Sequence, residues 1–292
     1  MQNELHLSQI PLKGGNAPWL SLEAQTSNSQ SIHISAANGF RAASYVHFLK
    51  QFNGRYSFTG MDCRGSWPKP PTPKPDFNMH DFANDLIEAL DQQYDQPVIG
   101  LGHSQGGLVT LIAAVQRPDL FSKIILIEPA SLPYSWIDRV YPHIPKSILY
   151  KLFPFMHGSL NRQRIWSTKK AFYDRYRQHN TYHRFTEQSF NDYMNHGLIK
   201  TDAGWELAFS PEWEAHIFQK VEFIWKYLAK VQVPTLFIKA EYSNLYSHQT
   251  FQKQNLKLSS ENVTNIEITD TYHLLPLENP EKCIEIIDNW LA

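Results

Sequence analysis

The stretch that decides the fold is Pro97-Val98-Ile99-Gly100-Leu101-Gly102-His103-Ser104-Gln105-Gly106. An apolar run leads straight into a Gly-x-Ser-x-Gly motif, and apolar residues at helical spacing follow it through residue 116. This order predicts a sharp strand-to-helix turn, because glycines at positions 102 and 106 remove the side chains that would clash where the chain reverses. Ser104 would then stand at the carboxyl edge of a sheet as a candidate nucleophile. Serine is a weak nucleophile alone, so it needs a base, an acid that orients the base, and oxyanion donors.

Outward from this turn, short apolar runs alternate with helical patterns, which is typical of βαβ units on a parallel sheet. The pattern predicts strands at residues 5–12, 19–24, 31–37, 56–62, 97–101, 123–127, 235–239 and 265–269. It predicts helices at residues 42–52, 79–90, 105–116 and 284–291. The proline-rich stretch 68–75 is predicted to be a loop, because proline cannot join a helix interior or a central strand.

Residues 131–220 interrupt this alternation and hold nearly half of the chain's Phe, Trp and Tyr residues. The segment is long and helical in pattern, so it is predicted to be an inserted helical cap on a core formed by residues 1–130 and 221–292. Most of its aromatic side chains are expected to pack the cap's own core, and a minority to line an apolar pocket. The basic residues between Arg162 and Arg184 are expected to form a solvated helix face.

The composition restricts the choice of partner. Lys and Arg total 27 against 28 for Asp and Glu, so no overall charge favours nucleic acid or an acidic membrane. Only Cys63 and Cys283 occur, which predicts neither a disulfide framework nor a cysteine metal site. We find no signal peptide or transmembrane pattern and expect a cytoplasmic protein that needs no metal or cofactor and binds a small molecule. The oligomeric state is not predicted.

The Gly-x-Ser-x-Gly turn and the loops near it make the chain resemble the α/β-hydrolase superfamily. The resemblance extends over nearly all of the chain. Ala36-Ala37-Asn38-Gly39-Phe40 is similar to that family's oxyanion loop, with Asn38 where histidine is usual, and residues 62–66 resemble its Asp-x-Arg-Gly turn. The resemblance implies a mostly parallel eight-stranded sheet flanked by helices, with a helical cap. It also implies that the backbone N–H groups of Phe40 and Gln105 form the oxyanion hole.

The base of such a site comes last in chain order, on the loop after the final strand. Residues 269–280, Thr-Asp-Thr-Tyr-His-Leu-Leu-Pro-Leu-Glu-Asn-Pro, fit that position and match the family's catalytic-histidine loop. Of the 13 histidines in the chain, only His273 has this placement. His273 is therefore the candidate general base.

The acid departs from the common pattern. After the strand before the last, the chain has Ser243 and Asn244 where the family normally has aspartate, and neither residue can carry the charge that stabilises an imidazolium. Glu128 ends the strand 123–127, the place where pancreatic-type lipases and some haloalkane dehalogenases carry their acid. A buried glutamate is costly without a partner, so a hydrogen bond to His273 would explain it. We predict Glu128 as the acid; Glu241, Asp270 or no acid at all remain open.

A Ser-His-acid site predicts a serine hydrolase that cleaves a small, largely apolar ester, thioester or lactone through an acyl-enzyme. Relatives that open epoxides or remove halides use an aspartate nucleophile, so Ser104 disfavours those reactions. Carbon–carbon bond hydrolysis, acyl transfer and a non-catalytic ligand-binding role on the same fold remain alternatives.

Overall fold

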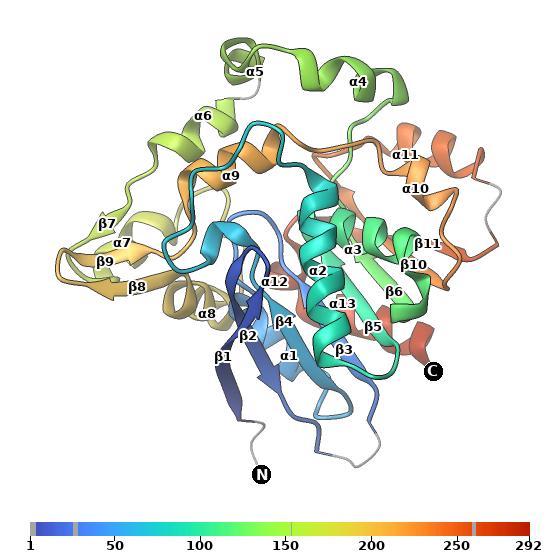
Figure 1. Cartoon of the computed structure of the whole chain (residues 1–292), viewed down its shortest axis with the longest axis horizontal. Helices are drawn as coiled ribbons and strands as arrows, with labels where there is room; N and C mark the ends of the chain where they lie inside the picture. The colour runs from blue at the N-terminus through green and yellow to red at the C-terminus, as the bar shows by residue number, and fades with distance from the viewer. Residues whose placement is uncertain (1–3, 26–28, 153, 259–260) are drawn as a thin grey trace.

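A computed structural model describes residues 4–25, 29–152, 154–258 and 261–292, and its centre is one eight-stranded sheet with helices on both faces (Figure 1). The sheet has the order β1-β2-β4-β3-β5-β6-β10-β11. The predicted fold class, a mostly parallel sheet flanked by helices with an inserted region, is confirmed. The strands are β1 (Leu5–Leu12), β2 (Gly15–Leu22), β3 (Ser31–Ser35), β4 (Ser57–Met61), β5 (Val98–His103), β6 (Phe121–Ile127), β10 (Thr235–Tyr242) and β11 (Val263–Tyr272).

Strand direction places the site. β2 runs antiparallel to β1 and β4, whereas β4, β3, β5, β6, β10 and β11 all run parallel. The carboxyl ends of these parallel strands therefore meet at one edge of the sheet, where ligands bind in open α/β folds. β5 is buried at every residue, because helices cover both of its faces.

Two apolar layers sandwich the sheet. On one face lie α2 (Met79–Gln93) and α3 (Gln105–Gln116), and on the other lie α1 (Val46–Lys50), α12 (Leu275–Glu278) and α13 (Pro280–Leu291). A capping box between Asn78 and Asp81 starts α2. Short 3₁₀ turns occupy η1 (Ala42–Tyr45), η2 (Arg64–Ser66), η3 (Pro118–Leu120) and η4 (Tyr141–His143), and α10 (Trp225–Leu228) and α11 (His248–Asn255) flank β10.

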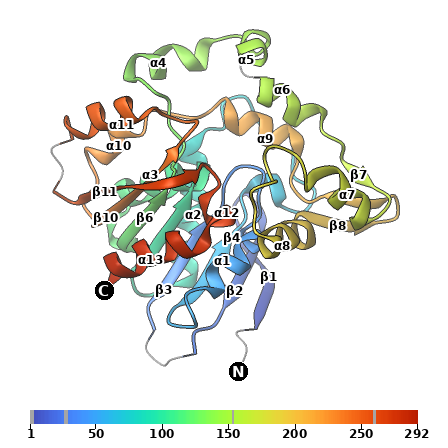
Figure 2. The same ribbon diagram turned by 180° about the vertical axis from the view of Figure 1, so that it is seen from behind.

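The segment between β6 and β10 rises over the carboxyl edge of the sheet, with α4 and α5 farthest out (Figures 1 and 2). Before α10, its α-helices are α4 (Ser135–Val140), α5 (Lys146–Leu152), α6 (Pro154–Asn161), α7 (Lys169–Tyr176), α8 (Glu187–Gly197) and α9 (Pro211–Phe218). It also holds a small antiparallel sheet of β7 (Ile165–Trp166), β9 (Gly204–Leu207) and β8 (Leu198–Thr201), so the expectation of a purely helical cap was incomplete. The limits 131–220 stay a prediction.

The other differences concern boundaries. β2 begins at Gly15 and not at residue 19, because a tight turn pairs Leu12 with Gly15. β11 runs on to Tyr272, and the predicted helix 42–52 is divided between η1 and α1. Residues 68–75 form no helix or strand, as their prolines predict. Within the described ranges, no helix is long and apolar enough to span a bilayer.

Candidate active site

Ser104 occupies the turn between β5 and α3 in a strained backbone conformation, with φ 53° and ψ −117°. A Cβ atom on Gly102 would lie 2.5 Å from the Gly106 carbonyl oxygen, and one on Gly106 would lie 2.1 Å from the Ser35 carbonyl oxygen. Only glycine permits both approaches, so α3 can start directly beside the end of β3. The Ser104 N–H donates to Ile127 O at 3.0 Å, which ties the turn to β6.

His273 follows β11 directly and reaches the serine from the loop predicted to carry the base. Its Nε2 atom lies 3.0 Å from Ser104 Oγ, and its Nδ1 atom lies 3.2 Å from Glu128 Oε2. Because the carboxylate only accepts, the network assigns the proton to Nδ1 and leaves Nε2 free to accept from the serine hydroxyl. The structure thus brings Ser104, His273 and Glu128 into one line of hydrogen bonds.

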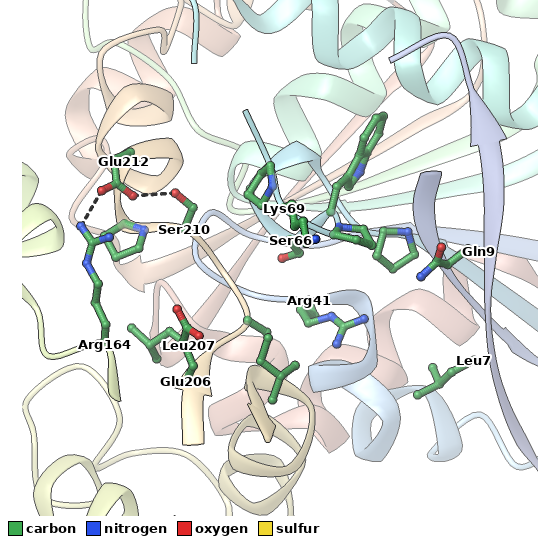
Figure 3. Close-up of a pocket in the computed structure, with 18 of the residues that line it drawn as sticks. Leu7, Gln9, Arg41, Ser66, Lys69, Arg164, Glu206, Leu207, Ser210 and Glu212 are labelled. Atoms are coloured by element: carbon green, nitrogen blue, oxygen red, sulfur yellow. Dashed lines mark hydrogen bonds and ion pairs between the residues drawn. The ribbon is translucent and has the colours of Figure 1, made fainter. Parts of the chain in front are cut away.

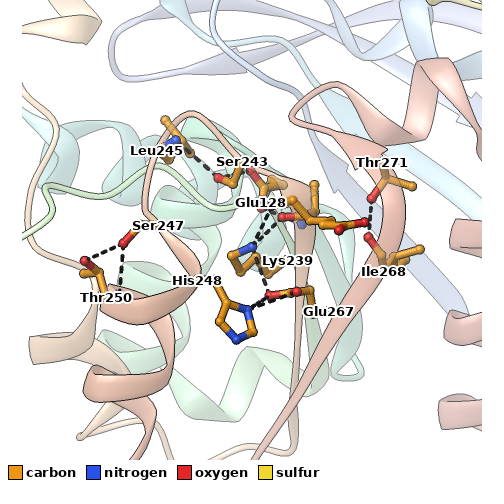
Figure 4. Close-up of polar contacts among 12 residues, drawn as sticks. Glu128, Lys239, Ser243, Leu245, Ser247, His248, Thr250, Glu267, Ile268 and Thr271 are labelled. Carbon is orange, nitrogen blue, oxygen red and sulfur yellow. Dashed lines mark hydrogen bonds and ion pairs between the residues drawn. The ribbon is translucent and has the colours of Figure 1, made fainter.

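Glu128 is fully buried at the end of β6, and its φ of 44° is rare for a residue with a side chain. Besides His273, two donors hold its carboxylate: the Ala240 N–H at 2.7 Å on Oε1 and the Ser243 hydroxyl at 2.7 Å on Oε2 (Figure 4). These bonds compensate the burial of a charge. In the sequence, Ser243 stands out only as a residue that cannot serve as the acid. No local pattern predicts its hydrogen bond to Glu128.

The other two acid candidates lie elsewhere. Glu241 is exposed, and its Oε2 atom accepts the Asp270 N–H at 2.8 Å. Asp270 has a left-handed backbone with φ 55° and is also exposed. Among the hydrogen bonds of the described residues, the carboxylate beside His273 Nδ1 is that of Glu128.

A buried lysine fixes the strand end that supplies one of these donors. Lys239 is fully buried, and its Nζ atom donates to Ala240 O at 2.6 Å (Figure 4). The same ammonium lies 3.0 Å from Glu267 Oε2 on the neighbouring strand β11. The ion pair and the backbone bond together hold the end of β10, where the Ala240 N–H faces Glu128.

The oxyanion loop is a tight turn between β3 and η1. Gly39 has φ 84°, and the Phe40 N–H donates to Ala37 O at 3.1 Å. Asn38, which stands where histidine is usual, donates from Nδ2 to Glu214 O at 2.9 Å and fastens the loop to α9. A role for Phe40 as an oxyanion donor stays a prediction, and it requires the bond to Ala37 to be shared or released.

Gln105 is the first residue of α3, so its N–H has no carbonyl one turn earlier in the helix to bind. The positive end of the helix dipole lies at the same place, beside Ser104. Both features favour a developing negative charge next to the serine, which is the role predicted for Gln105.

Comparison with known families adds to this geometry. A family model, Hydrolase_4, described as serine aminopeptidase, S33, matches residues 34–280. The chain belongs to this family of α/β-hydrolases.

Individual relatives of this Hydrolase_4 chain are distant. It is 28% identical over 95 residues to the uncharacterized hydrolase YugF of Bacillus subtilis, which covers 32% of this chain and 31% of that protein. It is 22% identical over 209 residues to human monoglyceride lipase, covering 70% of this chain and 61% of the lipase. The matched part spans about a third of the first relative's length. A crystal structure of E-2-(acetamidomethylene)succinate hydrolase shares the fold, with a TM-score of 0.79, 16% identity and 99% coverage of both chains.

The insertion between β6 and β10 packs aromatic rings against the oxyanion loop. The Phe40 ring centroid lies 5.0 Å from that of Tyr193 and 6.2 Å from that of Phe185. Trp166 and Phe172 are buried in the insertion's own core, whereas Tyr134 and Trp136 are exposed. Tyr173 packs edge-on against Phe190. Two further aromatic residues of the insertion are not described: residue 153 and the side chain of residue 155 lie outside the described part of the chain.

Some of the basic residues between Arg162 and Arg184 form ion pairs with acidic side chains. Arg162 pairs with Glu214 at 2.7 Å, and their side chains are only 11% and 12% exposed. Lys170 pairs with Asp174 on the surface of α7. The expectation of a solvated helix face therefore fits Lys170, whereas Arg162, which follows α6, forms a largely buried ion pair with Glu214 on α9.

Two cavities lie near this region. A cleft of about 750 Å³ is lined by β1, the proline-rich loop and the small sheet of the insertion, and it contacts none of Ser104, His273 and Glu128 (Figure 3). A cavity of about 30 Å³ touches Phe40 and Gln105. In the described residues, no group of three or more His, Cys, Asp or Glu is arranged to bind a metal ion.

One further carboxyl group belongs to the electrostatics of the site. Burial raises the pKa of Glu278 on α12 to about 7, against the opposing effect of the nearby Arg184 guanidinium. The carboxyl is therefore close to half ionised at neutral pH.

Proposed function

We propose that this chain is a serine hydrolase that cleaves small, largely apolar carboxylic esters, thioesters or lactones. The observation that carries the proposal is the continuous hydrogen-bonded line from Ser104 Oγ through His273, at 3.0 Å and 3.2 Å, to a buried carboxylate. Nucleophile, base and acid need this mutual geometry for acyl transfer. Membership in a hydrolase family and the distant likeness to monoglyceride lipase support the same class of reaction.

In the acylation step, Ser104 Oγ attacks the carbonyl carbon of the substrate while His273 Nε2 accepts the hydroxyl proton. Glu128 stays ionised and stabilises the imidazolium through Nδ1–H. The Gln105 N–H stabilises the negative charge on the carbonyl oxygen. His273 then returns its proton to the departing alkoxide or thiolate, which leaves the acyl group bound to Ser104.

In the second step, water attacks the acyl-enzyme and His273 Nε2 accepts a proton from it. The tetrahedral intermediate collapses, the carboxylic acid leaves and Ser104 regains its proton from His273. The aromatic surroundings of Phe40 favour an apolar acyl group beside the reacting carbon.

The two cysteines, remote in sequence, fit a cytoplasmic location.

The proposal is tested with the variant Ser104→Ala. Turnover of p-nitrophenyl acetate should fall by about 10³-fold or more, because no other group replaces the nucleophile. Ser122→Ala, on the exposed side of β6, is the matched control and should retain full activity. A fluorophosphonate probe should label the wild type at Ser104. If the probe does not label the wild-type protein, the non-catalytic alternative is supported instead. If hydrolysis survives in Ser104→Ala, a group other than Ser104 is the nucleophile.

A further inference from the structure

A second line of hydrogen bonds runs behind the proposed nucleophile, through two side chains that the triad does not use. His103 Nε2 lies 2.9 Å from the backbone oxygen of His273, and His103 Nδ1 lies 2.7 Å from the Tyr45 hydroxyl oxygen. The Ala37 N–H donates to the same hydroxyl oxygen at 3.2 Å. The His103 and Tyr45 side chains are both fully buried.

Chemistry fixes the direction of every bond in this line. A carbonyl oxygen only accepts, so His103 carries its proton on Nε2. Nδ1 of the neutral ring must then accept, and the Tyr45 O–H donates to it. The Tyr45 oxygen in turn accepts from Ala37. A protonated His103 would place two donors face to face, but burial and the nearby His273 lower the pKa of His103 to about 3.

The line joins three parts of the proposed site that are far apart in the sequence. Its one end is the backbone of His273, which presents the base to Ser104. Its other end is Ala37, whose carbonyl oxygen holds the Phe40 N–H in the oxyanion turn. Its middle, His103, is the residue before the nucleophile. The two loops are thus linked to each other, and to the residue before the nucleophile, through the His103 and Tyr45 side chains.

We infer that Tyr45 and His103 are positioning residues that hold the base loop and the oxyanion loop in a fixed relation to Ser104. This inference rests on the proposed function for its catalytic consequence. Acyl transfer depends on placing base and donors within a fraction of an ångström of their working positions. Burying two polar side chains lowers folding stability unless all of their hydrogen bonds are made. If Tyr45 and His103 only filled space in the core, two apolar side chains would stabilise the fold more.

The mild test is Tyr45→Phe, which keeps the ring and removes both hydrogen bonds of the hydroxyl. We expect kcat for p-nitrophenyl acetate, and the rate of fluorophosphonate labelling, to fall about tenfold while KM changes less than about twofold. Tyr94→Phe is the matched control, because its hydroxyl binds Thr59 Oγ1 at 2.6 Å, away from the site. All rates are compared at a temperature at which each variant is folded by circular dichroism.

His103 provides a graded second test. Glutamine keeps an N–H donor for the His273 carbonyl oxygen, whereas leucine keeps none. His103→Gln should therefore retain clearly more activity than His103→Leu, which should lose at least about tenfold in kcat. Equal kcat in both variants and the wild type, or a wild-type kcat in folded Tyr45→Phe, would overturn the inference.

Amide hydrogen exchange separates this inference from the proposed function, because it needs no turnover. Among the hydrogen bonds of the described residues, Tyr45 binds the oxyanion loop directly and reaches the base loop through His103. Tyr45→Phe should therefore speed exchange both at residues 36–40 and at residues 272–275. Faster exchange confined to residues 36–40 would show that the two loops are not coupled, whether or not the chain hydrolyses esters.

Discussion

Glu128 combines two costs, a left-handed φ of 44° and a fully buried carboxylate. Backbone strain of this kind amounts to about 1–3 kcal/mol and persists where the surroundings determine it. Here three donors converge on the carboxylate, from Ala240, Ser243 and His273. One of these donors, Ser243, is with Asn244 one of the two residues that stand where the resemblance to the α/β-hydrolase superfamily places an aspartate. The two acid positions are therefore neighbours in space, although they lie on different strand ends.

This proximity yields a prediction about moving the acid. Glu128→Gln should lower kcat/KM by about two to four orders of magnitude, because the amide cannot stabilise the imidazolium. Adding Ser243→Asp should recover at least about tenfold, since the Ser243 hydroxyl lies 2.7 Å from the oxygen that binds His273. Steady-state rates on p-nitrophenyl esters measure both effects. Glu241→Gln, the exposed alternative, should leave the rate unchanged; a large loss there would identify Glu241 as the acid.

The sequence predicts the placement of a candidate site residue when that residue stands in a local motif. It does not predict contacts that depend on which elements lie side by side in the fold. Ser104 and His273 stand in motifs that the sequence displays, and the end of a buried strand marked Glu128. The contact between Ser243 and Glu128 depends on β10 lying beside β6, which no local pattern specifies. The same holds for Tyr45, whose hydroxyl meets His103 at the end of β5.

At the scale of elements, the strands and helices of the core followed their apolar patterns closely. The hairpin of β8 and β9 was missed, because these strands are four residues each and only Leu198 of β8 is buried. A short strand with one buried residue offers too little alternation to stand out from the surrounding helices. The aromatic content predicted correctly that rings such as Phe172 pack the insertion's own core.

The turn between β5 and α3 gives a prediction for an element. Gly106→Ala should destabilise the protein by about 2 kcal/mol or more, since its Cβ would lie 2.1 Å from Ser35 O and 2.6 Å from Ala36 O, and both atoms are backbone. Gly158→Ala, in α6, meets nothing within 4 Å and should be neutral or slightly stabilising, because alanine favours a helix. Urea unfolding compares the two. Equal stability of both variants would contradict this close approach.

At the scale of the whole molecule, the sheet encloses histidines that are neutral in the folded state. His33 on β3 is buried, with Nδ1 2.8 Å from Thr59 Oγ1, and burial lowers its pKa from 6.5 to about 3. Unfolding returns the histidine to water, where it binds a proton below about pH 6.5. Between about pH 6.5 and pH 3 the unfolded state therefore holds more protons than the folded state. The stability that His33 contributes is complete above pH 6.5 and is lost as the pH falls towards 3.

The variant His33→Leu removes this proton uptake. It tests whether His33 makes the folded state less stable as the pH falls. From pH 7 to pH 5 the free energy of unfolding of the wild type should fall by about 2 kcal/mol more than that of the variant, the linkage expected for one histidine. Urea unfolding at each pH measures the difference. Above pH 7 the two curves should run parallel, because His33 is neutral in both states. Other groups, including His103 and the buried Asp62, are common to both proteins and cancel. Parallel curves down to pH 5 would show that His33 binds equal numbers of protons in the folded and unfolded states, so that burial does not lower its pKa.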